Sequence, residues 1–225
     1  GNGAGKSTML NAIAGVFQVD SGTITIDGQD VTKLPEHKRA AFLGRVFQDP
    51  MMGTAPTMQI EENLALAARR GQPRGLKWGI TALERADYRE LLKTLDLGLE
   101  DRLTAKVGLL SGGQRQALTL LMASLKQPKL LLLDEHTAAL DPKTADKVLA
   151  LSDQIVQENN LTTLMITHNM KDAIAHGNRL IMMDAGRVVV DISGEDKKKL
   201  TVPDLLALFS RASGSDEAND KMLLS

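Results

Sequence analysis

Hydrophobic residues along the chain occur in short apolar runs and in helical spacings. The strongest run is KLLLLDE at 129–135, where four leucines between Pro128 and an acidic pair predict a buried parallel strand. Shorter runs predict strands at 23–27, 44–48 and 162–167, and a hairpin of 179–184 and 187–191 turned by Ala185-Gly186. Helical spacing predicts helices over 6–16, 35–41, 58–70, 81–95, 112–126, 142–160, 169–176 and 203–211. Strands that alternate with helices predict an α/β fold with a mainly parallel sheet flanked by helices.

The distribution of the predicted helices and strands along the chain suggests four parts. Residues 1–50 would hold the first helix and a β region with the remnant of an antiparallel sub-domain, and 109–212 the rest of the α/β core. Between them, 51–108 is expected to be a helical sub-domain, and 213–225 a polar, flexible tail. A helical insert with Trp78, in the loop at 71–79, and a Met-rich loop suits docking onto another protein, and a local helical core explains it equally well.

Composition limits the classes of function. The 27 basic and 28 acidic residues give a net charge of −1. The chain therefore lacks the excess of positive charge that is typical of a nucleic-acid binder. The absence of cysteine excludes disulfides and thiolate chemistry. No apolar run approaches the roughly 18 residues of a membrane span, and no secretory signal is visible.

The chain begins with GNGAGKST, which matches the end of a phosphate-binding P-loop, G-x-x-x-x-G-K-[ST]. Its glycines would let backbone N–H groups close on phosphate oxygens, with the positive end of the following helix behind them. Lys6 would neutralise the β- and γ-phosphates, and the Ser7 hydroxyl would hold Mg²⁺. The alternative is a glycine-rich turn that caps an ordinary helix.

Polar residues follow three of the expected strands. Asp134 could hold Mg²⁺ through water, and Glu135 could polarise an attacking water. Gln48 could offer its carbonyl oxygen to Mg²⁺ or to a water, although its position alone favours a plain loop glutamine. His168 would share a sheet edge with Glu135 and could contact a γ-phosphate, whereas a lone histidine there is usually a capping or loop residue.

Two helix starts carry both a structural and a functional interpretation. In LSGGQ at 110–114, Ser111 would be the N-cap and Gln114 the capping-box residue, while Gly112 and Gly113 leave the positive helix end open to an anion. Asp141 before a proline would be an N-cap with proline at N1, and a role across an interface is about as plausible.

With these motifs in this chain order, residues 1–209 strongly resemble the ATP-binding subunit of ABC transporters. The resemblance implies ATP and Mg²⁺ as cofactors, Walker B at 130–134, Glu135 as the catalytic carboxylate, and Gln48 and His168 as the Q-loop and switch residues. It implies that Ser7, Gln48 and Asp134 hold the metal. It implies nucleotide contacts by Walker A, the signature and the D-loop: Asn2, Gly3, Ala4, Gly5, Lys6, Ser7, Thr8, Ser111, Gly112, Gly113, Gln114 and Asp141.

The resemblance also implies partners. Members work as head-to-tail dimers in which each nucleotide lies between one chain's P-loop and the other's signature. The helical sub-domain would receive the coupling helices of a permease at the cytoplasmic face of the membrane, with a solute-binding protein as an indirect partner. The phrase EHTAALDP at 135–142, with His136 where most members have proline, is similar to a bacterial importer subgroup for amino-acid-like solutes.

The first P-loop glycine, its feeding strand and the family's adenine-stacking aromatic would precede Gly1, so we expect an N-terminally truncated chain that binds ATP poorly alone. Two other functions remain open. A soluble ABC ATPase acting on nucleic acid or ribosomes would usually carry two cassettes or a coiled-coil insertion, and this chain has neither a heptad run nor a basic patch. A truncated chain could also occupy a partner's interface without hydrolysing ATP.

Overall fold

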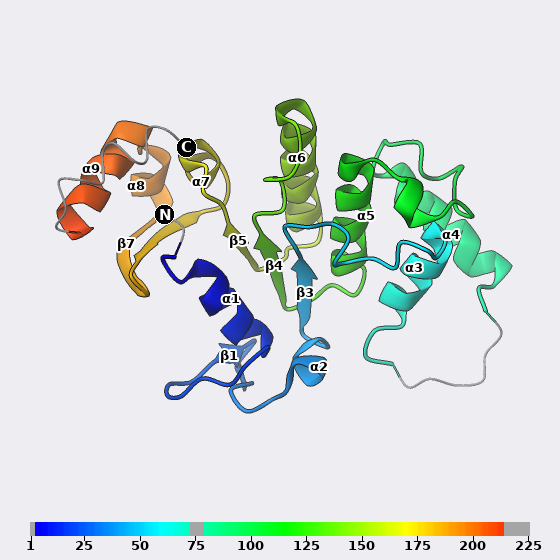
Figure 1. Cartoon of the computed structure of the whole chain (residues 1–225), viewed down its shortest axis with the longest axis horizontal. Coiled ribbons are helices and arrows are strands. Elements are labelled where there is room, and N and C mark those ends of the chain that lie inside the picture. The colour runs from blue at the N-terminus through cyan, green and yellow to red at the C-terminus, as the bar shows by residue number, and fades with distance from the viewer. Residues whose placement is uncertain (1–2, 73–78, 214–225) are drawn as a thin grey trace. The chain divides into compact units, whose positions relative to one another are not determined.

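The computed structural model describes residues 3–72 and 79–213 (Figure 1). The chain divides into two compact units. The first unit combines Gly1–Asn11 with Ile166–Ser225, and the second is Ala12–Met165. Trp78 and the expected tail from residue 214 onward lie outside the described residues. Within the described part, no helix combines the length and the apolar character that a membrane span requires.

The elements follow in this order: α1 Lys6–Ala14, β1 Thr25–Ile26, β2 Gln29–Asp30, α2 Glu36–Arg39, β3 Leu43–Val46, α3 Ile60–Ala68, α4 Ala82–Lys93, the 3-10 turn η1 Val107–Leu109, α5 Gly112–Ser124, β4 Leu130–Asp134, α6 Pro142–Glu158, β5 Thr163–Ile166, α7 Met170–Ala175, β6 Arg179–Asp184, β7 Arg187–Ser193, α8 Gly194–Lys198 and α9 Val202–Ser213.

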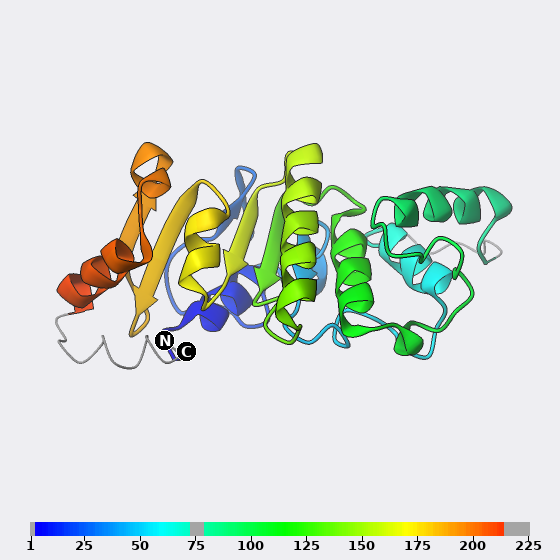
Figure 2. The same ribbon diagram turned by 90° about the horizontal axis from the view of Figure 1, so that it is seen from above.

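A three-stranded sheet in the order β3-β4-β5 forms the centre of the second unit. β3 pairs in parallel with β4, from Leu43 opposite Leu130 to Val46 opposite Leu133, so the leucine run is the buried parallel strand that the sequence predicts. Figure 2 shows α6 lying over these strands, with α5 beside it. Gly44 permits the close approach of α5, because a Cβ there would lie 2.5 Å from the carbonyl oxygen of Ala123.

The helices of the second unit enclose their own apolar core. Ile60 and Leu64 of α3 pack with Leu92 of α4 and with Leu118 and Leu121 of α5. Capping boxes lie at Gln59 before α3 and at Thr81 before α4. Each box fixes the N-terminus of its helix through residues that are close in sequence.

The described part of the first unit is built on the antiparallel pair β6–β7, with Arg179 opposite Ser193 and Asp184 opposite Arg187. Ala185 and Gly186 turn the hairpin with φ of 45° and 79°, the left-handed geometry that two-residue hairpins favour. The buried Lys197 of α8 donates hydrogen bonds to the carbonyl oxygens of Ile174 and His176 at 2.5 and 2.9 Å, and so ties α8 to α7.

Some predicted boundaries of helices and strands were wrong, and one helix was missed. The strand expected at 23–27 is only β1, because the chain turns back at once through Asp27 and Gly28, both with positive φ, to pair with β2. Pro35 is the N-cap of α2 rather than its first helical residue, and the first helix ends at Ala14 because Gly15 has φ of 83°. Helix α8 was not predicted, because its five residues, GEDKK, contain no apolar spacing that would indicate a helix.

Candidate nucleotide-binding site

The P-loop segment lies in the first unit and is fixed by the β6–β7 hairpin. Gly3 and Gly5 have φ of 89° and 91°, which only glycine adopts without strain. The amide of Gly186 donates to the carbonyl oxygen of Ala4 at 3.1 Å, and a Cβ on Gly5 would lie 3.2 Å from Cα of Gly186. Asn2, predicted with this loop, lies outside the described residues.

α1 begins at Lys6, and its first intrahelical bond runs from Met9 N to Gly5 O at 2.9 Å. Amides in the first turn of a helix have no intrahelical acceptor, so this turn can bind a phosphate between Gly5 and Thr8. The Lys6 side chain is half-buried, and Ser7 and Thr8 are exposed. The glycine geometry and the helix start therefore fit a bound nucleotide phosphate.

The other end of α1 is held by Arg39, a residue that the sequence did not single out. Its guanidinium is fully buried and donates to the carbonyl oxygens of Ala12 and Ile13 at 2.7 and 2.9 Å. It also donates to Leu34 and Thr32, each at 2.8 Å. Burial lowers the pKa of Arg39 from its ordinary value. Arg39 thus donates to carbonyl oxygens at the end of α1, where the α-helical hydrogen-bond ladder stops; the oxygen of Ala12 also accepts from Gly15 N at 3.2 Å.

The carboxyl edge of the sheet in the second unit brings three candidate residues together. Asp134 ends β4, Glu135 follows it, and exposed Gln48 lies two residues beyond the end of the parallel neighbour β3. Arg45 of β3, not predicted as a site residue, places Nη2 3.7 Å from Oδ2 of Asp134 and stacks on Phe47 with Cζ 4.5 Å from the ring centroid.

The loop from Glu135 to Asp141 is built of successive turns. Glu135 has φ of 44°, and its carbonyl oxygen accepts from Ala138 N at 3.0 Å. Asp141 accepts from Thr144 N at 3.1 Å, which confirms it as the N-cap of α6 with proline next. Hydrogen bonds from Thr144 hold the pKa of Asp141 below its usual value.

The LSGGQ segment forms the expected capping box. Ser111 Oγ accepts from Gln114 N, and Gln114 Oε1 accepts from Ser111 N, each at 3.2 Å. A Cβ on Gly113 would collide with Cγ2 of Thr144, so this glycine is required where α5 meets α6. Ser111 and Gly112 are exposed, which leaves the helix start accessible to an anion.

His168, in the first unit, follows the end of β5 by two residues and is exposed. The N-cap of α7 is its neighbour Asn169, whose side chain accepts from Lys171 N and Asp172 N. The capping role considered for His168 therefore belongs to Asn169.

The candidate metal-binding residues suit Mg²⁺ better than a metal ion that is coordinated mainly by protein side chains. In the described ranges, no three His, Asp or Glu side chains gather into a metal site. Mg²⁺ commonly takes only one or two carboxylates and completes its octahedron with phosphates and water. Gln48 and Asp134 of the second unit offer side-chain oxygens of the type that this ion needs, and so does Ser7 of the first unit.

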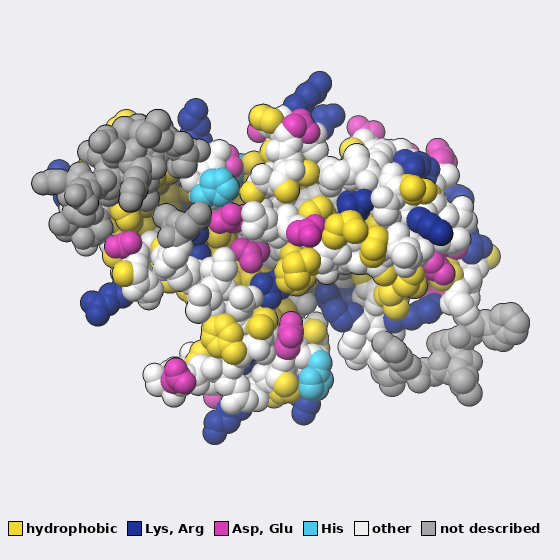
Figure 3. Space-filling model, in the orientation of Figure 1, with side chains coloured by type: hydrophobic (Ala, Val, Ile, Leu, Met, Phe, Trp, Pro, Cys, Tyr) yellow, Lys and Arg dark blue, Asp and Glu magenta, His cyan; other side chains and the backbone are white. Residues whose placement is uncertain are grey.

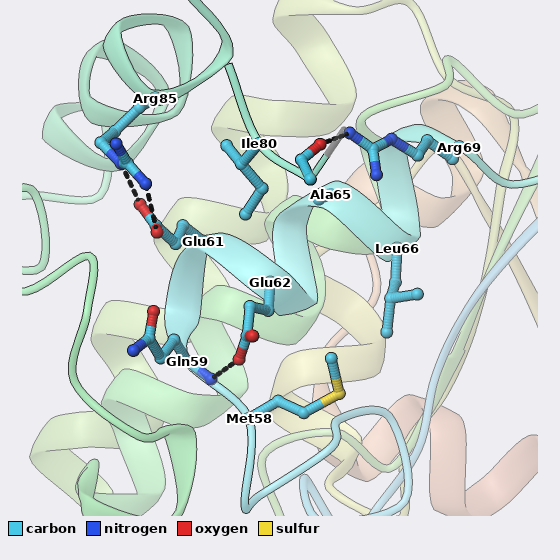
Figure 4. Close-up of a pocket in the computed structure, with 10 residues that line it drawn as sticks. Met58, Gln59, Glu61, Glu62, Ala65, Leu66, Arg69, Ile80 and Arg85 are labelled. Carbon is cyan, nitrogen blue, oxygen red and sulfur yellow. Dashed lines mark hydrogen bonds and ion pairs between the residues drawn. The ribbon is translucent and has the colours of Figure 1, made fainter. Parts of the chain in front are cut away.

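A pocket of about 320 Å³ lies beside α3, and its lining includes Met58, Leu66 and Ile80 (Figure 4). At one side Arg85 donates two hydrogen bonds of 2.5 and 2.8 Å to the buried carboxylate of Glu61, which lowers the pKa of Glu61. At the other, Gln59 N donates to Glu62 at 2.7 Å. Arg69, also in the lining, donates to the carbonyl oxygen of Gly79 at 2.6 Å and to Glu84 at 3.0 Å. The charged groups Glu61, Arg69 and Arg85 of this pocket are therefore held in ion pairs.

A glycine loop at a helix start, and a buried parallel strand that ends in an acidic pair, define a P-loop nucleoside triphosphatase. The family model described as ABC transporter matches residues 1–138. The chain belongs to this family, as an ABC-type ATPase and ATP-binding subunit.

Two curated relatives and one solved structure are similar to it. The chain is 50% identical over 211 residues to the tyrosine transport ATP-binding protein of Clostridioides difficile, covering 94% of this chain and 84% of that protein. It is 39% identical to the methionine import ATP-binding protein MetN of Rhizobium etli, covering 84% of this chain and half of that protein. A dimeric ATP-binding cassette, MJ0796 bound to ADP and Pi, superposes with a TM-score of 0.71 at 30% identity, covering 86% of this chain and 82% of that one.

Proposed function

We propose that this chain hydrolyses ATP to drive import of an amino-acid-like solute across a membrane. The observation that carries the proposal is the 50% identity, over nearly the whole chain, with a tyrosine transport ATP-binding protein. A methionine import protein among the relatives supports the same solute class.

In this proposal the P-loop from Asn2 to Thr8 binds the triphosphate, with Lys6 on the β- and γ-phosphates. Mg²⁺ would be held by Ser7 and Gln48, and by Asp134 through water, and would neutralise charge on the transferred phosphoryl group. Glu135 would polarise the attacking water, and His168 would contact the γ-phosphate.

We further propose that two copies pair head to tail, with Ser111–Gln114 of one copy on the nucleotide of the other and Asp141 at the interface. The exposed start of α5 supports this, because an open helix start can bind an anion and the chain's own P-loop does not require a second such start. The dimeric cassette with ADP and Pi, at 30% identity, supports the pairing of two copies. Hydrolysis would remove the attraction of both chains to the γ-phosphate and let them part.

The permease would dock on the helical sub-domain at the cytoplasmic face of the membrane, with a solute-binding protein as an indirect partner. Exposed apolar side chains support a protein-docking surface in this region: Met51, Met52, Leu66, Leu83 and Leu109. On the face in Figure 3, Lys and Arg side chains are interspersed with Asp and Glu over the described residues, which favours a protein partner over nucleic acid.

Replacing the proposed catalytic carboxylate tests the hydrolysis. Glu135→Gln should reduce ATP turnover at least about 100-fold, while ATP-dependent dimers accumulate in light scattering. Glu158→Gln, at an exposed glutamate near the end of α6, is the matched control and should hydrolyse normally. Normal turnover by Glu135→Gln would remove Glu135 from the mechanism.

Uptake measurements test the solute. Proteoliposomes holding the subunit with its permease and binding protein should import radiolabelled tyrosine or methionine with ATP, and should not import thiamine. ATP-dependent import of thiamine alone would contradict the proposed solute class.

A further inference from the structure

His136, immediately after the proposed catalytic glutamate, points into the interior of the second unit. It is 2% exposed, and Nε2 lies 2.9 Å from Oγ of Ser152, itself 3% exposed. Buried polar side chains are retained at low cost only when they are hydrogen-bonded, and this pair is.

The direction of this hydrogen bond follows from the second contact of Ser152. Its hydroxyl donates to the carbonyl oxygen of Val148 at 2.8 Å, one helical turn earlier in α6. A serine hydroxyl has one hydrogen, so toward His136 it acts as an acceptor. Nε2 of His136 therefore carries the hydrogen and donates to Ser152.

Ser152 is a firm anchor because it lies in the middle of the 17-residue helix α6. Its neighbours on the same face, Val148, Leu149 and Ile155, are buried. The histidine thus joins the loop after β4 to a rigid helix 16 residues further along the chain.

The loop needs such an anchor at this point. Glu135 has φ of 44°, a left-handed conformation that is unfavourable for a residue with a Cβ. A strained backbone persists only where its surroundings hold it. The next side chain along, His136, is the one fixed in the core by a directional bond.

We propose that His136 is a positioning residue, which holds the backbone of Glu135 in its left-handed conformation by hydrogen-bonding through Nε2 to Ser152 of α6. The proposal rests on the role of Glu135 in the proposed function. The proposal distinguishes two effects of the side chain at position 136, which are filling space in the core and orienting the loop. An apolar side chain there can fill the same space, but it cannot fix the loop to one point on α6.

Steady-state ATP hydrolysis by the full-length protein tests this with matched variants. His136→Leu keeps a similar apolar volume and removes the donor; Ser152 can still donate to Val148, so this variant should fold. We expect kcat to fall about tenfold with the KM for ATP within about twofold of wild type, as for a misplaced catalytic group. His136→Gln carries an N–H donor at similar reach and should restore most of kcat.

Ser152→Ala removes the acceptor from the other side and should lower kcat in the same way. Alanine suits a helix interior, so this variant decides the matter if His136→Leu does not fold. The double variant should be no slower than the slower single one, because both changes remove the hydrogen bond between His136 and Ser152.

Wild-type kcat in both His136→Leu and Ser152→Ala would overturn the proposal, as would a His136→Gln variant as slow as His136→Leu. Equal changes in kcat and KM would assign the residue to general structure. Glu135→Gln in the same assay keeps the two ideas apart. If it is inactive while His136→Leu is normal, only the positioning role fails; if it is active, the proposed function of Glu135 fails.

Discussion

Arg45 and Asp134 meet across the parallel strands β3 and β4, with Nη2 of the arginine 3.7 Å from Oδ2 of the aspartate. Arg45 pairs in register with Leu132, so Asp134 lies two residues further along β4 on the same face. The side chains are only 15% and 16% exposed, which limits solvent screening of the pair.

This cation should oppose Mg²⁺ binding at Asp134. At about 4 Å, two unit charges near a protein surface interact by roughly 1 to 4 kcal/mol. Arg45→Met should therefore lower the Mg²⁺ concentration for half-maximal ATPase activity by at least about threefold, measured by Mg²⁺ titration at saturating ATP. Arg45→Lys keeps the charge and should stay near wild type. An unchanged Mg²⁺ requirement in Arg45→Met would show that the pair has no influence on the metal.

Loss of the Arg39 guanidinium should destabilise the fold. Arg39→Met keeps much of the side-chain length but leaves the carbonyl oxygens of Ala12, Ile13, Thr32 and Leu34 without this donor. Because each buried polar group left unpaired costs about 1–3 kcal/mol, we expect a loss of at least about 3 kcal/mol in the free energy of unfolding. Urea denaturation measures it, with the exposed neighbour Lys38→Met as control. Equal stability of the two variants would contradict the role of Arg39.

The glycine at 113 should be required by packing, and a second change should relieve that requirement. Gly113→Ala would place a methyl group against Cγ2 of Thr144 and should cost about 1–3 kcal/mol of stability. Thr144→Ser lacks that methyl group and keeps the backbone amide that Asp141 caps, so the double variant should recover most of the loss.

Gly112→Ala is the matched control. Its Cβ would lie 3.3 Å from the flexible Leu140 side chain, so it should cost less than Gly113→Ala. Thermal melting of the four variants checks both expectations. Failure of Thr144→Ser to restore stability would mean that the collision is not the cause.

Stability should depend on pH through Glu84 at the start of α4. Hydrogen bonds from the Thr81 backbone, from Arg69 and from the Thr81 hydroxyl hold its pKa at about 2, against 4.5 ordinarily. A depressed pKa stabilises the folded state above the unfolded value, so this contribution is full above about pH 4.5 and is lost as pH falls toward 2. Side-chain capping of this kind contributes about 1 kcal/mol.

The difference in urea midpoint between wild type and Glu84→Ala should therefore shrink between pH 7 and pH 3.5, within the window set by the two pKa values. Glu84→Gln keeps an acceptor for the capping box and cannot titrate, so it should lack this component of the pH dependence. A difference that stays constant down to pH 3.5 would contradict the assignment.

Much of the fold could be predicted from the sequence, because the patterns that specify it involve residues close together in the chain. Residues within a few positions of one another determine three of these features: the leucine run of β4, the capping box at Ser111 and the N-cap at Asp141. The hairpin turn at Ala185 and Gly186 is of the same kind. The family, too, followed from short motifs in chain order, and the comparisons confirm it.

The roles of the predicted site residues stay predictions, and the residues missed beside them share one property. Arg39, Arg45 and His136 act through partners 5 to 89 positions away, such as Ala12, Asp134 and Ser152. His136 drew notice only as a departure from the family's usual proline, and nothing near it in the chain indicates a buried donor.

The sequence by itself determined the class of protein, the phosphate-binding and acidic motifs, and the helix caps, because each is written in a few consecutive residues whose chemistry is local. Only the tertiary structure decided which cations and donors surround those motifs. The bonds of Arg39 to Ala12, of Arg45 to Asp134 and of His136 to Ser152 form only where folding brings distant segments within about 3 to 4 Å, and no spacing along the chain encodes those contacts.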